Sequence, residues 1–257
     1  MKFEEMINTI QLGDSYELIK QIPDKSIDCI YVDIPYLYQS GGKGRNEMGD
    51  RIWNLKQKLI ENNIYDGIDF SIFNEFIRIS KHINCFIWCS ILQVYPILKW
   101  FNENTNTNYN ILIWNKTNPA PLGNNSWLND IEYCLYFRDK ASGTRLNDGY
   151  ELKSKWYTSP INQNDKDLFK HPTIKPLELV KRHILHSTQP DDIVLDCFCG
   201  SGTTCVACKE TGRRYIGMEI DKEYWKIANN RINGIEASGQ MTIMFDDKGN
   251  VMLGDNK

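Results

Sequence analysis

The sequence predicts an α/β protein whose core is a doubly wound, mostly parallel sheet of seven strands. Short strand-like runs alternate with longer helix-like runs, which is typical of βα units. Of the 257 residues, 41% are hydrophobic and 25% are charged, as in soluble globular proteins that bury a core. No apolar run approaches the roughly 20 residues of a membrane span, and the acidic start does not resemble a signal peptide. We therefore expect a cytoplasmic protein that makes no membrane contact.

Hydrophobic periodicity places the elements of the first half. Phe70, Phe73, Phe76 and Ile77 fall on one helical face, which predicts a helix at 70–80. Apolar runs rich in aromatic and β-branched residues predict the strands. In chain order we expect strands at 8–13 and 27–33, this helix, a strand at 84–90, a helix at 92–102, and strands at 110–115 and 131–137.

The second half continues the same alternation. Pro176 stands at a favoured first-turn position and predicts a helix that runs to residue 187. The tail at 241–253 predicts two short strands joined by a turn at 246–250. Between helix and tail we expect a strand at 191–197, a helix at 203–211, a strand at 214–220 and a helix at 222–233.

Two segments interrupt this pattern. Residues 37–67 carry several glycines among charged residues, which indicates a mobile loop. Residues 138–170 show no clean period, and we interpret them as an insert. The chain is therefore divided into a first half of the core at 1–137, which includes the loop, the insert, and a second half with the tail at 171–257.

The net charge of −3 argues against a polyanionic partner, but the charge is unevenly spread. Residues 138–182 hold ten basic and six acidic side chains, and residues 39–58 hold five basic and two acidic ones. These two basic segments are able to bind a polyanion such as nucleic acid. A solvated loop face explains the same charges equally well.

Most of the eight cysteines lie in apolar runs, where a reduced thiol packs as a small hydrophobe. We expect no disulfide framework. Cys205 and Cys208 have the spacing of half a zinc site, but no second close pair follows them. Buried thiols are therefore expected rather than a metal site.

A glycine-rich turn follows the strand expected at 191–197. Gly200 and Gly202 let the backbone bend and approach a ligand, and the next helix offers free N–H groups. Glu219 ends the following strand, where its carboxylate can accept hydrogen bonds from a ribose diol. Cys205 replaces the third glycine of a dinucleotide fingerprint, which disfavours a dinucleotide. A tight βα turn without a ligand remains the alternative.

A second motif, Asp33-Ile34-Pro35-Tyr36, stands at the end of the strand expected at 27–33. An exocyclic amine of a nucleobase is a poor nucleophile because its lone pair is delocalised into the ring. The Asp33 carboxylate and the Ile34 carbonyl can accept both N–H groups and favour a more tetrahedral nitrogen. Tyr36 offers a stacking face for a flipped base. Taken alone, the tetrapeptide is better explained as a polar strand end with a proline turn.

Together these motifs resemble the S-adenosylmethionine-dependent amino methyltransferases that act on DNA. The tetrapeptide that begins at Asp33 is similar to their Asp-Pro-Pro-Tyr catalytic motif, and the run from Asp196 to Thr204 is similar to their cofactor motif. The catalytic motif comes first here, as in the permuted group called the β class. Three further segments match that group, namely Leu12-Gly13-Asp14-Ser15, residues 171–176 and residues 215–221.

The resemblance implies a Rossmann-like methyltransferase fold, S-adenosylmethionine as cofactor, and roles for the matched residues. Asp33, Ile34, Pro35 and Tyr36 would hold the target base. Asp14 would contact the cofactor adenine and Glu219 the ribose, while His171, Thr173 and Lys175 would lie near the methionine carboxylate. The remaining cofactor residues would be Asp196, Phe198, Gly200, Ser201, Gly202 and Thr203.

The implied reaction is direct methyl transfer to an exocyclic nitrogen, without a covalent intermediate. Adenine N6 is the expected target, because adenine enzymes of this family usually begin the motif with Asp. Cytosine N4 methylation, a non-catalytic DNA-binding relative, and a protein or RNA amino methyltransferase remain alternatives. Ile34 replaces the family's first proline, so we expect a less rigid loop.

DNA contacts are assigned to the two basic segments, with the insert at 138–170 as the expected recognition region. Basic residues are interleaved there with Trp156 and Tyr157. A cognate restriction endonuclease and a homodimer stay open as further partners. The expected DNA-binding residues are Lys43, Arg45, Arg138, Lys140, Arg145, Lys153 and Lys155.

Overall fold

The structure is a computed structural model of the chain. It describes residues 2–37, 67–119, 127–140, 153–161 and 174–234, and the backbone of two short strands at 244–245 and 251–252. Most of the expected loop and much of the expected insert lie outside the described residues. The same holds for five expected site residues, Lys43, Arg45, Arg145, His171 and Thr173.

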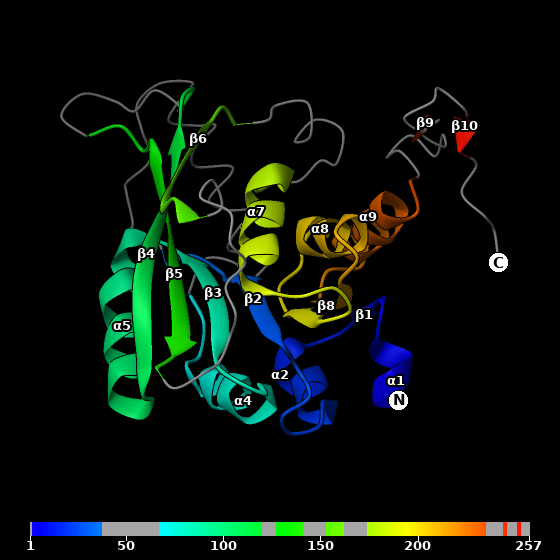
Figure 1. Cartoon of the computed structure of the whole chain (residues 1–257), viewed down its shortest axis with the longest axis horizontal. Coiled ribbons are helices and arrows are strands. Elements are labelled where there is room, and N and C mark those ends of the chain that lie inside the picture. The colour runs from blue at the N-terminus through cyan, green and yellow to red at the C-terminus, as the bar shows by residue number, and fades with distance from the viewer. Residues whose placement is uncertain are drawn as a thin grey trace.

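One mixed sheet forms the centre of the described core, with helices on both faces (Figure 1). Its strand order is β1 (Thr9–Leu12), β8 (Arg214–Glu219), β7 (Ile193–Asp196), β2 (Cys29–Asp33), β3 (Asn84–Cys89), β5 (Ile131–Asp139), β4 (Thr107–Lys116) and β6 (Trp156–Ser159). The helices are α1 (Phe3–Met6), α2 (Ser15–Leu18), η1 (Ile19–Gln21), α4 (Ser71–Ile79), α5 (Ile91–Asn104), α7 (Leu177–Ser187), α8 (Thr203–Glu210) and α9 (Lys222–Ile232).

The sheet confirms the α/β prediction and contains one more strand than expected. Neighbouring strands are parallel, except that β5 runs antiparallel to both β3 and β4. The additional strand is β6, which belongs to the expected insert and pairs in parallel with β4 at the edge of the sheet. Its four residues are too few and too exposed for periodicity to identify them.

Alternate residues of the central strands enter two different hydrophobic layers. On β2, Ile30 and Val32 belong to the cluster that contains the buried residues of α4 and α5. Cys29 and Tyr31 belong to the cluster that contains those of α7, α8 and α9. Helices thus cover both faces, which confirms the doubly wound arrangement, and all eight cysteines are buried thiols as expected.

The five helices expected from the sequence begin and end within two residues of their predicted bounds. The short elements α1, α2 and η1 were not predicted, because three or four residues carry no periodic signal. In the tail, β9 (Met244–Phe245) and β10 (Val251–Met252) pair antiparallel, as the turn pattern predicted. Among the described helices, none has the length and apolar character needed to span a bilayer.

Candidate active site

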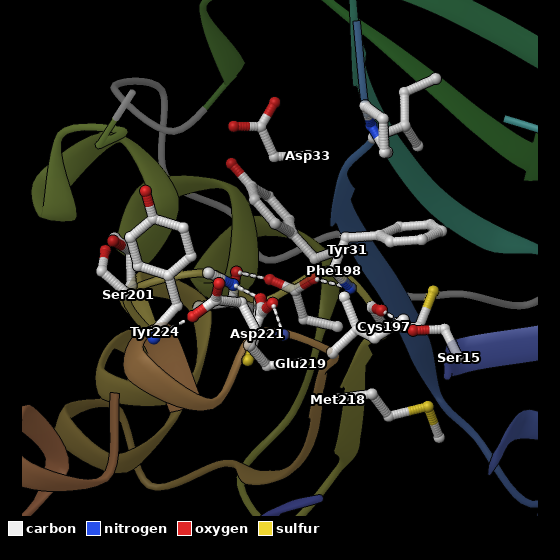
Figure 2. A pocket seen from close by; sticks show the side chains of 18 of the residues that line it. Ser15, Tyr31, Asp33, Cys197, Phe198, Ser201, Met218, Glu219, Asp221 and Tyr224 are labelled. Carbon is white, nitrogen blue, oxygen red and sulfur yellow. Dashed lines mark hydrogen bonds between the residues drawn. The ribbon is translucent and has the colours of Figure 1, made fainter. Parts of the chain in front are cut away.

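The carboxyl ends of three parallel strands surround a cavity of about 370 Å³ (Figure 2). Asp33 ends β2, Asp196 ends β7 and Glu219 ends β8. Because β7 pairs in parallel with both β2 and β8, the three carboxyl ends lie at the same end of the sheet. Open α/β sheets bind ligands at the carboxyl ends of their strands. The structure therefore brings together two motifs that are far apart in the sequence.

Most of the expected site residues line this cavity. Those that do are Asp14, Asp33, Ile34, Pro35, Tyr36, Lys175, Asp196, Phe198, Gly200, Ser201, Thr203 and Glu219.

The turn between β7 and α8 is organised by Asp196. One oxygen of its carboxylate accepts a hydrogen bond from the Phe198 N–H at 3.1 Å, and the other accepts one from the Thr204 hydroxyl at 2.6 Å. Burial raises the pKa of Asp196 to about 7. Gly200 has a φ of 51°, in the left-handed region that favours glycine. The turn thus takes the tight form that the sequence predicted.

The structure gives Gly202 a role in packing. It does not line the cavity, and its φ is 79° at the start of α8. A Cβ atom added to Gly202 would lie 2.9 Å from the Cβ of Ala228 on α9. Glycine is therefore needed here so that α8 and α9 can pack closely.

Glu219 is buried at the end of β8. Its two carboxylate oxygens accept hydrogen bonds from the N–H groups of Gly200 and Asp221, both at 2.8 Å. Each oxygen keeps a second lone pair, so the carboxylate can still accept hydrogen bonds from a ribose diol. Asp14 lies in the loop before α2, and the neighbouring Ser15 hydroxyl donates to the Cys197 carbonyl, which ties α2 to the glycine turn.

The cavity wall is acidic. Its described lining contains five carboxylic acids and a single lysine, Lys175. These carboxylates would repel a pyrophosphate, whereas they attract a ligand that carries a sulfonium or ammonium group. Phe198 and Met218 add apolar contact area. The residues therefore fit S-adenosylmethionine better than a dinucleotide.

The loop after β2 is held by hydrogen bonds from its neighbours. The N–H of Ile34 donates to the Trp88 carbonyl on β3 at 3.2 Å, a bond that proline at this position could not make. The Gln93 side chain of α5 donates to the Pro35 carbonyl at 2.9 Å. The expected loss of rigidity from the missing proline is thus offset by hydrogen bonds.

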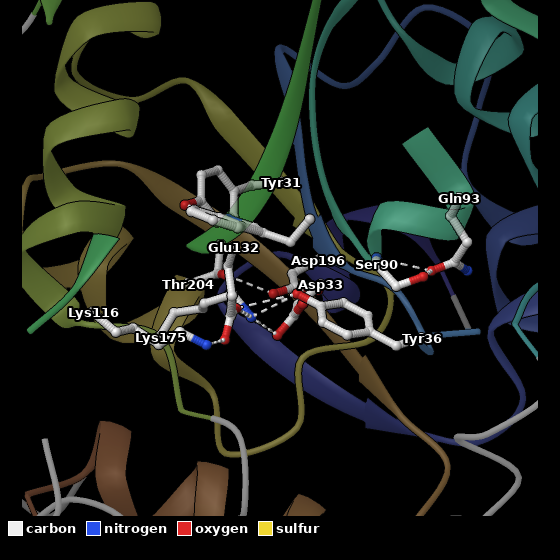
Figure 3. A network of polar contacts seen from close by, with 11 residues as sticks. Tyr31, Asp33, Tyr36, Ser90, Gln93, Lys116, Glu132, Lys175, Asp196 and Thr204 are labelled. Carbon is white, nitrogen blue, oxygen red and sulfur yellow. Dashed lines mark hydrogen bonds and ion pairs between the residues drawn. The ribbon is translucent and has the colours of Figure 1, made fainter. Parts of the chain in front are cut away.

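An alternating chain of charges lies beside this loop (Figure 3). The Lys175 ammonium lies 2.5 Å from Oδ2 of Asp33 and 3.1 Å from Oε2 of Glu132. Oε1 of Glu132 lies 3.2 Å from the Lys116 ammonium. The Tyr36 hydroxyl accepts a hydrogen bond from Lys175 at 3.2 Å and donates to Glu132 at 3.3 Å.

Burial and the neighbouring charges act on these groups in opposite directions. Burial raises the pKa of Asp33 above its ordinary value, and the Lys175 ammonium opposes that rise. Burial alone would lower the pKa of Lys175, but Asp33 and Glu132 outweigh it and raise that pKa. Burial would raise the pKa of Glu132, but Lys175 and Lys116 hold it below its ordinary value. The chain therefore consists of two ammonium groups that stabilise two carboxylates.

Glu132 and Lys116 were not among the predicted site residues. Glu132 lies at the start of β5 and Lys116 at the end of β4. The antiparallel pairing of these strands, in which Trp114 lies opposite Glu132, brings both residues beside the cavity. The one available signal was a carboxylate at the start of the otherwise apolar run at 131–137. Such a buried charge requires a partner.

The described residues among the expected DNA-binding set lie in two different places. Because β5 is antiparallel to β3, Arg138 pairs with Asn84 at the start of β3. Arg138 and the following Lys140 therefore lie at the end of the sheet that is opposite Asp33. Contact between these two residues and a base at the cavity is therefore not supported. Lys153 and Lys155 are exposed and directly precede β6.

Comparison with known proteins supports the geometry. Residues 27–230 match the family described as DNA methylase. The chain is 32% identical over 244 residues to the type II methyltransferase M2.LlaDCHI of Lactococcus lactis subsp. cremoris, covering 86% of this chain and 87% of that protein. It is also 32% identical over 256 residues to the type II methyltransferase M.HinfI of Haemophilus influenzae, covering 90% and 70%.

Solved structures show the same fold. The crystal structure of the M1.HpyAVI–SAM complex superposes with a TM-score of 0.62 at 27% identity, covering 88% of this chain and 98% of that one. The cytosine-N4-specific PvuII DNA methyltransferase gives a TM-score of 0.60 at 16% identity, covering 86% and 85%. At that lower identity the likeness concerns the fold alone.

Proposed function

This chain belongs to the DNA methylase family and uses S-adenosylmethionine, and we propose that it methylates the exocyclic N6 of an adenine flipped out of DNA. S-adenosylmethionine supplies an electrophilic methyl group on a sulfonium sulfur. The chain's own residues bind the base, orient its amino group and exclude water. Aligning the two reactants contributes at most about 7–11 kcal/mol to lowering the barrier.

One observation supports this proposal above the others. Oδ1 of Asp33 is buried and has no hydrogen-bond partner among the described residues, although Asp33 lines the cavity. A buried carboxylate oxygen without a donor is costly, so it indicates that a donor is supplied by a ligand. The amino group of a flipped base is such a donor, and Tyr36 can stack on its ring.

We expect purified protein, incubated with S-adenosylmethionine and DNA, to form N6-methyladenine. Asp33 at the first motif position favours adenine over cytosine. The measurement is digestion of the DNA to nucleosides followed by mass spectrometry. N4-methylcytosine as the sole product would contradict the adenine assignment, and binding of DNA without any methylated product would favour the non-catalytic alternative.

We propose that the edge strand β6 and the lysines before it contact DNA. Trp156 is half exposed there, and Lys153 and Lys155 are exposed. Arginines and lysines that meet phosphates position the duplex without specifying its sequence. The recognition role of the whole segment at 138–170 and the contacts expected of Lys43, Arg45 and Arg145 stay predictions.

Replacing Lys153 and Lys155 with Ala is expected to flatten the salt dependence of DNA binding. Each lost phosphate contact makes the slope of log K against log salt less negative by about 0.9. The control is Lys140→Ala, which removes an exposed lysine at the opposite edge of the sheet. If the slope changes only in Lys140→Ala, the DNA contacts the end of the sheet that carries Lys140.

The relatives named as type II methyltransferases support a restriction-modification role, and we propose a cognate restriction endonuclease as partner. A cytoplasmic location is proposed because eight buried thiols suit a reducing compartment that also holds DNA. The homodimer and the β-class assignment stay predictions.

A further inference from the structure

The chain of charges beside Asp33 is more buried than ion pairs normally are. The side chains of Lys175 and Lys116 are 6% and 8% exposed, and those of Glu132 and Asp33 are 19% and 26% exposed. Burying such a network brings little net stability, because the cost of desolvation offsets the attraction between the charges. Its place next to the catalytic motif therefore points to function.

The hydrogen bonds of Lys175 define what it can contact. An ammonium group has three N–H donors and no acceptor. All three are matched, by Oδ2 of Asp33 at 2.5 Å, Oε2 of Glu132 at 3.1 Å and the Tyr36 hydroxyl at 3.2 Å. No donor is left for a cofactor carboxylate, in contrast to the role expected from the sequence resemblance.

The same contacts orient the two groups that would hold the base. Lys175 occupies Oδ2 of Asp33, which leaves Oδ1 as the acceptor without a partner. Glu132 accepts a hydrogen bond from the Tyr36 hydroxyl at 3.3 Å and so fixes the far end of the ring. The Lys116 ammonium lies beside the second carboxylate oxygen of Glu132 and balances its negative charge.

We propose, on the basis of the proposed function, that Lys175 and Glu132 are a positioning pair for methyl transfer. Lys175 holds Asp33 ionised and turned so that Oδ1 accepts a hydrogen bond from the target amine. Glu132 anchors both Lys175 and the hydroxyl of Tyr36. Neither residue needs to touch the cofactor.

The charges around Asp33 predict the direction in which each variant shifts the pH dependence of activity. Lys175 favours the ionised form of Asp33, whereas Glu132 disfavours it. The other titratable groups that interact with Asp33 are Tyr36, Tyr31, Cys89, Cys134 and Asp196. Activity requires ionised Asp33 as acceptor, so it is lost as pH falls through the pKa of Asp33.

The test is the single-turnover rate of methyl transfer as a function of pH, which reports chemistry rather than product release. Lys175→Met is expected to move the acidic limb of the pH–rate profile to higher pH by about 1–3 units, the usual effect of one close opposite charge. Glu132→Gln is expected to move it to lower pH by about one unit, a tenfold change in the low-pH rate. A merely structural defect would not move the limb in opposite directions.

Lys81→Met is the matched control, because Lys81 pairs with Asp28 at 2.8 Å at the other end of β2. It should leave the limb in place. Asp196 also lines the cavity and has a pKa of about 7. The Asp33 charge raises the pKa of Asp196, so a limb caused by Asp196 would stay in place or move to lower pH in Lys175→Met, where less Asp33 is ionised. It would therefore not show the shift to higher pH expected of Asp33. If Lys175→Met does not fold, Lys175→Arg, which keeps the charge, should retain the limb at a reduced rate.

Affinity for S-adenosylmethionine separates this inference from its alternative. Both variants should bind the cofactor as the unaltered protein does. A Lys175→Met variant with weakened cofactor binding and an unmoved limb would overturn the inference and restore the role at the methionine carboxylate. If Asp33→Ala itself remained active, the proposed function would fail instead, whatever the two positioning variants showed.

Discussion

Replacing Asp33 with Ala is expected to reduce methyl transfer by on the order of 10³-fold, because it removes the acceptor that holds the target amine. The affinity for S-adenosylmethionine should change little, because Lys175 already compensates the charge of Asp33. The expected cofactor contacts come instead from Glu219 on β8 and from the turn between β7 and α8. Lys175 keeps its contact with Glu132, so the variant should fold. Single-turnover kinetics and isothermal calorimetry measure the two quantities separately.

Asp28→Asn is the matched control for this variant. Asp28 immediately precedes β2 and pairs with Lys81, as Asp33 ends β2 and pairs with Lys175. Loss of the Asp28 charge should lower stability slightly and leave methyl transfer near that of the unaltered protein. Equal losses of activity in the two variants would mean that Asp33 acts through the fold and not on the base.

The meeting of the two motifs was implied by the family resemblance, which assigns both to one methyltransferase site. Parallel strands place their carboxyl ends at the same end of a sheet, but strand and helix periods do not say which strands are neighbours. The structure supplies that information, because Ile30 of β2 pairs with Leu195 of β7.

The direction of β5 was the information that periodicity lacked. An apolar strand has the same pattern whichever way it runs. Because β5 is antiparallel to β3, its first residues, including Glu132, lie at the cavity edge, and its last residues, including Arg138, lie at the opposite edge. The undetermined direction of β5 therefore hid the position of Glu132 beside the cavity and the position of Arg138 away from it.

Gly202 shows a different limit of sequence reasoning. A glycine in a motif indicates close approach, but the motif does not say which group approaches. The structure identifies that group as Ala228, which is fully buried on α9. Asp221 and Tyr224, at the start of the same helix, line the cavity. Packing at Gly202 is thus linked to the cofactor cavity through α9.

Replacing Gly202 with Ala is therefore expected to destabilise the protein and weaken S-adenosylmethionine binding. The left-handed φ costs about 1–2 kcal/mol for a residue with a Cβ atom, and crowding against Ala228 adds about 1–3 kcal/mol. Gly212→Ala is the matched control, because Gly212 has a φ of 70° and nothing within 4 Å of the added Cβ. Thermal unfolding should show a clearly larger decrease in Tm for the Gly202 variant.

Ala228→Gly isolates the contact itself. It removes the Cβ atom that the new methyl group would meet at 2.9 Å, at a cost of about 1 kcal/mol in the helix interior. Replacing Gly202 should therefore cost less in the Ala228→Gly background than in the unaltered protein, and the double-mutant cycle measures the difference. Equal costs in both backgrounds would mean that the backbone conformation alone requires glycine. In that case the link between the turn and α9 would have no energetic basis.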